Sequence, residues 1–179
     1  MYQKDDAHSS ILFVCTGNIC RSPYAEAVAQ NSDVERVHFA SAGTHVQPGQ
    51  KMDRQMEKLT IARTGKFTDH AARQLTYDLI SEFDIIVAMA REHRRFIISE
   101  WPNFGQKTFL IGQIQRRLST PPPGLNLNNL CEYLWADRMA VKSDSIDDPY
   151  GKGAASARRS ARLIDDHLET ILGSLEHLS

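Results

Sequence analysis

A cysteine and an arginine, Cys15 and Arg21, stand at the two ends of the short segment CTGNICR. A cysteine thiolate can attack the phosphorus of a phosphate ester, and a guanidinium can bind two phosphoryl oxygens in a bidentate pair. The thiolate is available near neutral pH only where positive potential stabilises it. The spacing therefore predicts a loop that holds an anion against a nucleophilic sulfur.

The residues between this cysteine and arginine are suited to bind the anion through their main chain. The backbone N–H groups of residues 16–21 can curl around an anion, and we expect Gly17 and Asn18 to tolerate the unusual backbone angles that this requires. Ser22-Pro23 predicts a helix start, with Ser22 as the N-cap, so the positive end of a helix would face the same anion. The Ser22 hydroxyl is also a candidate donor to the Cys15 thiolate. The phosphate-binding candidates are Thr16, Gly17, Asn18, Ile19, Cys20 and Ser22.

A candidate proton donor lies far downstream, in the segment IDDPYG at residues 146–151. An aryl phosphate leaves poorly as a phenolate, so a carboxylic acid should protonate the leaving oxygen. Asp148, directly before proline, is the candidate, with Asp147 as its solvated neighbour. Tyr150 could form one wall of a cleft and stack on a substrate ring. Taken alone, the segment also fits an ordinary helix-breaking surface turn.

The composition and net charge of the chain argue against several classes of protein. The 179 residues are 41% hydrophobic and 24% charged, as in a soluble globular domain. A net charge of -1 gives no reason to expect nucleic-acid binding, and three cysteines argue against a secreted disulfide scaffold. We see no signal peptide and no apolar run of the ~20 residues that a membrane span needs. The expected location is the cytoplasm, with export without a signal peptide as an alternative.

Apolar runs alternate with helical patterns along the chain. We expect strands at residues 11–14, 37–40, 84–89 and 108–111, and helices at 22–31, 52–65, from 76, at 91–101 and over 157–175. This alternation predicts an α/β fold, a doubly wound four-stranded parallel sheet with helices on both faces. Ligands of such sheets bind beyond the carboxyl ends of the strands, where residues 15–22 are expected to lie.

We expect one domain over residues 1–179, with residues 1–9 frayed. Residues 116–147, rich in proline and asparagine, predict a loop insertion with a short helix near 130–138. This insertion could overhang the cleft or mediate an interface, including through Trp135, or be a tolerated surface loop.

Four segments in this order resemble the low-molecular-weight protein tyrosine phosphatase family. They are CTGNICRSPYAE from Cys15, SAGT from Ser41, DHAARQLT from Asp69 and DPY from Asp148, and the agreement extends from about residue 10 to 175. The resemblance implies a phosphatase I-like fold. It also implies hydrolysis of phosphotyrosine through a cysteinyl-phosphate, with Cys15 as nucleophile, Arg21 as phosphate ligand and Asp148 as general acid and base.

The same resemblance implies supporting roles and partners. Asn18, Ser41 and His70 match positions that hold the loop in shape by hydrogen bonds, and Cys20 could protect Cys15 by a reversible disulfide. No metal and no cofactor are expected. The expected partner is a phosphotyrosine-containing protein, with inorganic phosphate as product and with no nucleic acid or membrane. A monomer or weak dimer is expected.

The chain departs from the family pattern at three places. Ala90 stands where many members have an acidic residue, and Gly151 follows Tyr150 where a second aromatic is common. Residues 44–49 lack an aromatic side chain altogether, so weak ring stacking is expected.

Three alternatives of related chemistry remain. An arsenate reductase coupled to thioredoxin would need cysteines that residues 79–100 lack, but a reductase using a small thiol needs only Cys15. A cysteine phosphocarrier would need neither Arg21 nor Asp148. Protein-arginine phosphatases of the family tend to have threonine where this chain has Ile19, which favours tyrosine as the substrate.

Overall fold

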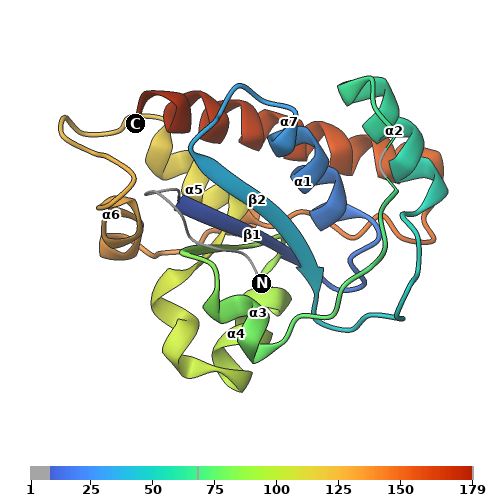
Figure 1. Cartoon of the computed structure of the whole chain (residues 1–179), viewed down its shortest axis with the longest axis horizontal. Helices are drawn as coiled ribbons and strands as arrows, with labels where there is room; N and C mark the ends of the chain where they lie inside the picture. The colour runs from blue at the N-terminus through green and yellow to red at the C-terminus, as the bar shows by residue number, and fades with distance from the viewer. Residues whose placement is uncertain (1–8, 68, 179) are drawn as a thin grey trace.

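Four parallel strands form the central sheet of the computed structural model, which describes residues 9–67 and 69–178. The strand order is β2-β1-β3-β4, so the predicted doubly wound sheet is confirmed (Figure 1). The strands are β1 (Ser9–Cys15), β2 (Val37–Gly43), β3 (Ile85–Ala88) and β4 (Thr108–Leu110). The helices are α1 (Arg21–Gln30), α2 (Arg54–Thr64), α3 (Tyr77–Ser81), α4 (Arg91–Glu100), α5 (Ile111–Leu118), α6 (Leu130–Ala136) and α7 (Gly153–His177), with short 3-10 turns η1 (Pro102–Lys107) and η2 (Lys142–Asp144).

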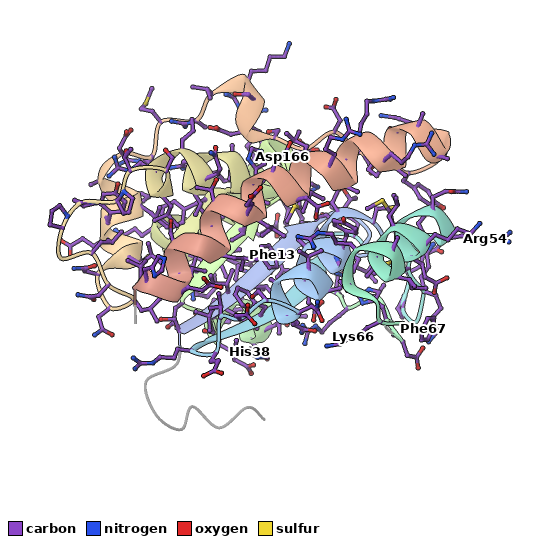
Figure 2. The ribbon with its side chains drawn as sticks, turned by 90° about the horizontal axis from the view of Figure 1, so that it is seen from above. Phe13, His38, Arg54, Lys66, Phe67 and Asp166 are labelled. Atoms are coloured by element: carbon purple, nitrogen blue, oxygen red, sulfur yellow. The ribbon has the colours of Figure 1, made fainter. Side chains whose placement is uncertain are left out.

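The apolar run of β1 is buried on both faces because side chains alternate along a strand. Ile11 and Phe13 join the core cluster that contains residues of α1, α2, α5, α6 and α7. Leu12 and Val14 point the other way, into a smaller cluster with α3, α4 and η1. Figure 1 shows the two layers above and below the sheet. Figure 2 looks down on the larger layer, where α7 crosses the molecule beside α1 and α2 and Asp166 lies on its outward side.

Among the element boundaries that differ from the prediction, two concern the start of a helix at or after a strand end. The first helix begins at Arg21, with Cys20 at the cap position and no side-chain cap, so Ser22 is not the N-cap. The Ser22 hydroxyl instead lies 2.9 Å from the Cys15 sulfur, and no side chain caps the first turn of α1. The second difference is α5, which begins at Ile111, a residue expected to end the fourth strand. Ile111, Ile114 and Leu118 are buried at helical spacing, and this helical face decides the conformation.

Residues 116–147 are packed more closely than a surface loop. Their first residues complete α5, and the short helix expected near 130–138 is α6. Leu130 and Leu134 are buried in the larger core cluster, and Trp135 packs against the same cluster. The segment is therefore anchored to the body of the protein through α6.

The prediction that residues 1–9 are frayed can be compared with the structure only at Ser9. Residues 1–8 lie outside the described residues, and Ser9 begins β1. In the ranges 9–67 and 69–178, no helix is both long enough and apolar enough to cross a bilayer.

Candidate active site

The carboxyl ends of β1 and β2 reach the same edge of the sheet, as their arrowheads show in Figure 1. A cleft of about 250 Å³ opens at the loop that follows β1. Its lining comes from this loop, from the segment after β2 and from residues before α7: Cys15, Thr16, Gly17, Ile19, Cys20, Arg21, His45, Gln47, Gln50, Asp148 and Tyr150. None of the described residues that line the cleft belongs to 116–147.

Cys15 is the last residue of β1, and only 2% of its surface is exposed. Its Sγ lies 2.9 Å from the Oγ of Ser22, in the first turn of α1. When the sulfur is a thiolate it can only accept, so the Ser22 hydroxyl must then be the donor. The strand end thus fixes the sulfur, and the helix start supplies a hydrogen-bond partner for it.

Asn18 supports the loop that follows β1 through hydrogen bonds of its side chain and backbone. It is fully buried, and its φ of 52° lies in the left-handed region, which asparagine tolerates better than most residues. Its Nδ2 donates to the hydroxyls of Ser22 (2.9 Å) and Ser41 (2.8 Å), and its Oδ1 accepts from the backbone of Arg73. The Nε2 of His70 lies 2.6 Å from the Asn18 carbonyl oxygen. The Asn18 and Ser22 side chains therefore support the loop and do not line the cleft.

The end of β2 braces the loop through its backbone. The N–H groups of Thr44 and His45 donate to the carbonyls of Cys15 (3.0 Å) and Thr16 (2.9 Å). A Cβ atom at Gly43 would lie 2.5 Å from the Thr16 oxygen, so only glycine allows this approach. Gly17 itself does not have a positive φ, contrary to the expectation that it shares the unusual backbone angles with Asn18.

Arg21 connects the loop to the segment that carries the candidate acid. The guanidinium is 2% exposed, its Nη1 donates to the Ile146 carbonyl at 3.1 Å, and its Nη2 lies 3.2 Å from Asp148 Oδ1. Its Nε is buried and bonds to no acceptor among the described residues. Tyr150 stands at the rim, 56% exposed, and its N–H donates to Asp148. Asp147 is exposed outside the cleft lining.

Cys20 lines the same cleft as Cys15, and both are free cysteines. Burial raises the pKa of the Cys20 thiol far above its ordinary value, and the nearby Asp53 and Cys15 act in the same direction. Cys20 is therefore a protonated thiol at neutral pH. Over the residues that the structure describes, no three His, Cys, Asp or Glu side chains gather as a metal site would require.

Two residues of α4 reach the site although the sequence patterns do not single them out. Glu92 Oε1 lies 3.9 Å from Arg21 Nη1, so a carboxylate two positions after Ala90 approaches the guanidinium from α4. His93 is buried, and its Nε2 lies 2.9 Å from the Thr16 hydroxyl. The signal available in the sequence is position, because the first polar residues after β3 must reach the same sheet edge as Cys15.

The rim of the cleft also contains residues that sequence reasoning missed. His45, Gln47 and Gln50 line it from the segment that follows β2. The His45 ring packs edge-on against Phe96, with centroids 5.2 Å apart. The segment 44–49 therefore places an imidazole ring at the rim, although it contains no phenylalanine, tyrosine or tryptophan.

The protonation of His93 leads to a prediction about stability. Burial, with a smaller effect of Arg21, lowers the pKa of His93 from 6.5 to about 3. Below pH 6.5 the His93 imidazole is protonated in the unfolded chain but stays neutral in the native state. The free energy of unfolding therefore decreases as the pH falls. From pH 6 to 4, this residue should remove about 1 kcal/mol per pH unit. Urea unfolding of the wild type and of His93→Asn at several pH values measures the difference in slope.

The exposed His177→Asn variant is the matched control for the loss of an imidazole. Equal slopes for the wild type and His93→Asn would contradict the assignment of a neutral, buried His93.

The sequence of the chain is similar to that of known phosphatases. The family model described as low molecular weight phosphotyrosine protein phosphatase matches residues 10–120. The low molecular weight protein-tyrosine-phosphatase Etp of Escherichia coli K12 is 32% identical over 127 residues, covering 71% of this chain and 85% of that protein. A protein-arginine-phosphatase of Geobacillus stearothermophilus is 29% identical over 165 residues, 92% of each chain.

Solved structures show the same fold. The YwlE arginine phosphatase of Geobacillus stearothermophilus superposes with a TM-score of 0.75 at 24% identity, covering 94% of each chain. The tyrosine phosphatase AmsI of Erwinia amylovora gives a TM-score of 0.71 at 25% identity, covering 97% of each chain. Both likenesses extend over nearly the whole chain.

Proposed function

Because the chain belongs to the low molecular weight phosphotyrosine protein phosphatase family, we propose that it hydrolyses phosphotyrosine in proteins through a cysteinyl-phosphate. The family membership makes it a phosphatase, and the residue roles and the substrate are the proposal. One observation carries it: Cys15, Arg21 and Asp148 line one cleft, although Asp148 comes from a distant part of the sequence.

In the first half-reaction, the Cys15 thiolate attacks phosphorus in line with the tyrosine oxygen. An S–P bond forms, the P–O bond to the phenol breaks, and Asp148 gives its proton to the departing oxygen. Arg21 and the amides of residues 16–21 hold the equatorial oxygens. The Nε–H of Arg21, which has no acceptor among the described residues, supplies the two donors of a bidentate pair together with an Nη.

In the second half-reaction, water replaces the cysteine. Asp148, now ionised, takes a proton from the water as its oxygen attacks phosphorus. The S–P bond breaks, the electron pair returns to sulfur, and inorganic phosphate leaves. The Ser22 hydroxyl, 2.9 Å from Sγ, stabilises the thiolate as it departs.

The remaining predicted residues position the loop. Asn18, Ser41 and His70 contact one another or the loop backbone, and none of them lines the cleft. Their role in the proposal is to keep the amides directed at the phosphate, so that little reorganisation is needed during the reaction.

Phosphoarginine is the second candidate substrate, because relatives of both kinds match this chain. Ile19 favours tyrosine, since its side chain lines the cleft and is 6% exposed. An apolar wall suits an aromatic ring, whereas a phosphorylated guanidinium would lose hydrogen bonds to water there without recovering them. Tyr150, at another part of the rim, adds a ring that can stack on the phenol.

The substrate is tested with two peptides that differ only in carrying phosphotyrosine or phosphoarginine. The wild type should hydrolyse the phosphotyrosine peptide with a kcat/KM at least about tenfold higher, and Ile19→Thr should reduce this ratio severalfold. Ile61→Thr, on the exposed surface of α2, is the matched control. If the wild type instead prefers the phosphoarginine peptide, the proposed substrate is phosphoarginine and not phosphotyrosine.

A further inference from the structure

Three arginines gather beside the cleft without belonging to it. Arg91 and Arg94 lie one helical turn apart on α4, and Arg138 follows α6 in the sequence. We call these three residues the arginine cluster. The chain as a whole has a net charge of -1, so the cluster is a local concentration of positive charge and not part of a generally basic surface.

Two hydrogen bonds to backbone carbonyls fix the position of the segment that carries Arg138. Arg91 Nη2 donates to the Ala140 carbonyl at 2.9 Å, and Arg116 Nη2 donates to the Met139 carbonyl at 3.0 Å. The Arg138 guanidinium lies over the Trp135 ring, 4.2 Å from its centroid. Residues 138–140 are therefore tied to α4 and α5, which places Arg138 in a defined position.

The nearby carboxylates are used elsewhere. Asp144 is 1% exposed and accepts two bonds of 3.0 Å from Arg116, and Asp137 lies 3.7 Å from Arg117. In the described part of the chain, no carboxylate forms a salt bridge with Arg91, Arg94 or Arg138. The Nε–H groups of Arg91 and Arg94 are buried and have no acceptor there, as is true of the proposed phosphate ligand Arg21.

Mutual repulsion within the cluster is evident at Arg94. Partial burial lowers its pKa, and the charges of Arg138 and Arg91 lower it further, with only Asp144 opposing them. A negatively charged ligand would relieve this repulsion.

The cluster is adjacent to the catalytic cleft. The Arg91 N–H donates to the Ser145 hydroxyl, and the Ile146 N–H donates to the Met89 carbonyl at 2.7 Å. The carbonyl of Ile146 in turn accepts from Arg21. The segment 145–148 therefore connects the arginine cluster with the acid end of the cleft.

We propose that the arginine cluster binds acidic side chains flanking the phosphotyrosine of the protein substrate. The proposal deepens the proposed function, on which it rests, because it names a sequence class of substrate for the same cleft. A peptide is favoured as the occupant because the cluster lies beside a cleft that takes one side chain of a protein. The neighbouring residues of that protein must then pass over the surface around it.

Kinetics with matched peptides test the proposal. One phosphotyrosine peptide carries glutamates on both sides of the phosphotyrosine, and the other carries alanines. The wild type should prefer the acidic peptide in kcat/KM, and Arg94→Ala/Arg138→Ala should lower this preference about fivefold, as expected for the loss of two charge pairs. Turnover of p-nitrophenyl phosphate, which has no flanking residues, should be unchanged and reports that the double variant is folded.

Arg158→Ala/Arg159→Ala, an exposed pair on α7, removes the same charge elsewhere and should keep the wild-type preference. An equal loss in both double variants would mean general charge attraction and would overturn the proposal, as would an unchanged preference in Arg94→Ala/Arg138→Ala. A second readout needs no catalysis: fluorescence anisotropy of a labelled, unphosphorylated acidic peptide, whose binding the cluster variant should weaken. If the wild type hydrolyses neither phosphopeptide, the proposed function fails. The binding measurement still tests whether the arginine cluster binds an acidic peptide.

Discussion

Cys15→Ser is expected to lower kcat for p-nitrophenyl phosphate by a factor of about 10³ or more, because a serine hydroxyl is not ionised at neutral pH. The substitution removes only a little volume from the buried site, because an oxygen replaces the somewhat larger sulfur at the same position. The bond to Ser22 can persist as O–H···O, so the loop should keep its shape. Steady-state kinetics and thermal unfolding of the two proteins separate the loss of chemistry from a loss of folding.

Cys131→Ser is the matched control, because Cys131 lies outside the cleft lining. It should retain wild-type turnover. Residual activity of Cys15→Ser within about tenfold of the wild type would remove Cys15 from the role of nucleophile.

The wild type in the same assay also distinguishes hydrolysis from phosphate carriage. A hydrolase should release p-nitrophenol in a burst followed by steady turnover. A burst without turnover would identify a cysteine phosphocarrier, the alternative in which the phosphocysteine is kept.

Asp148→Asn is expected to lower kcat by about 10²–10³, within the range usual for the loss of a general acid. The effect should grow as the leaving group becomes more basic, because phenol needs a proton more than p-nitrophenol does. Comparing kcat for a series of aryl phosphates therefore measures the role directly. Because the substitution also removes the 3.2 Å ion pair between Asp148 and Arg21, a change in KM is expected and is not diagnostic.

Asp147→Asn is the control, since the neighbouring carboxylate is exposed and outside the cleft lining. It should have nearly wild-type kcat and the wild-type dependence on the leaving group. If Asp147→Asn lost more activity than Asp148→Asn, the general acid would have to be reassigned to Asp147.

Much of the fold could be predicted from the sequence because its signals are local. The strand at Ile11–Val14 is a continuous apolar run, and α2 ends at Gly65, whose φ of 71° is the left-handed conformation that glycine favours at helix ends. The start of α5 could not be predicted in this way, because Ile111 fits a strand and a helix equally well. The choice depends on burial of Ile114 and Leu118 against distant segments.

The candidate site likewise contains residues that local sequence patterns predict and residues that they do not. The loop from Cys15 to Ser22 is one continuous stretch, so its spacing is visible in the sequence. Glu92 and His93 come to Arg21 and Thr16 only because β3 pairs with β1, a neighbour relation that no local pattern specifies. The prediction of Ser22 as a helix cap is wrong, because α1 begins one residue earlier, whereas the predicted contact between its hydroxyl and Cys15 is present in the structure.

The bracing of the loop has a consequence for how this protein can evolve. The contacts that fix the loop are made by Gly43, Asn18 and buried neighbours, whereas His45, Gln47 and Tyr150 at the rim take no side-chain part in them. Substitutions at the rim can therefore change the contacts with a substrate without removing the contacts that fix the loop. The residues that a substrate meets first and the residues that keep the loop in shape are two separate sets, so they can change independently of each other.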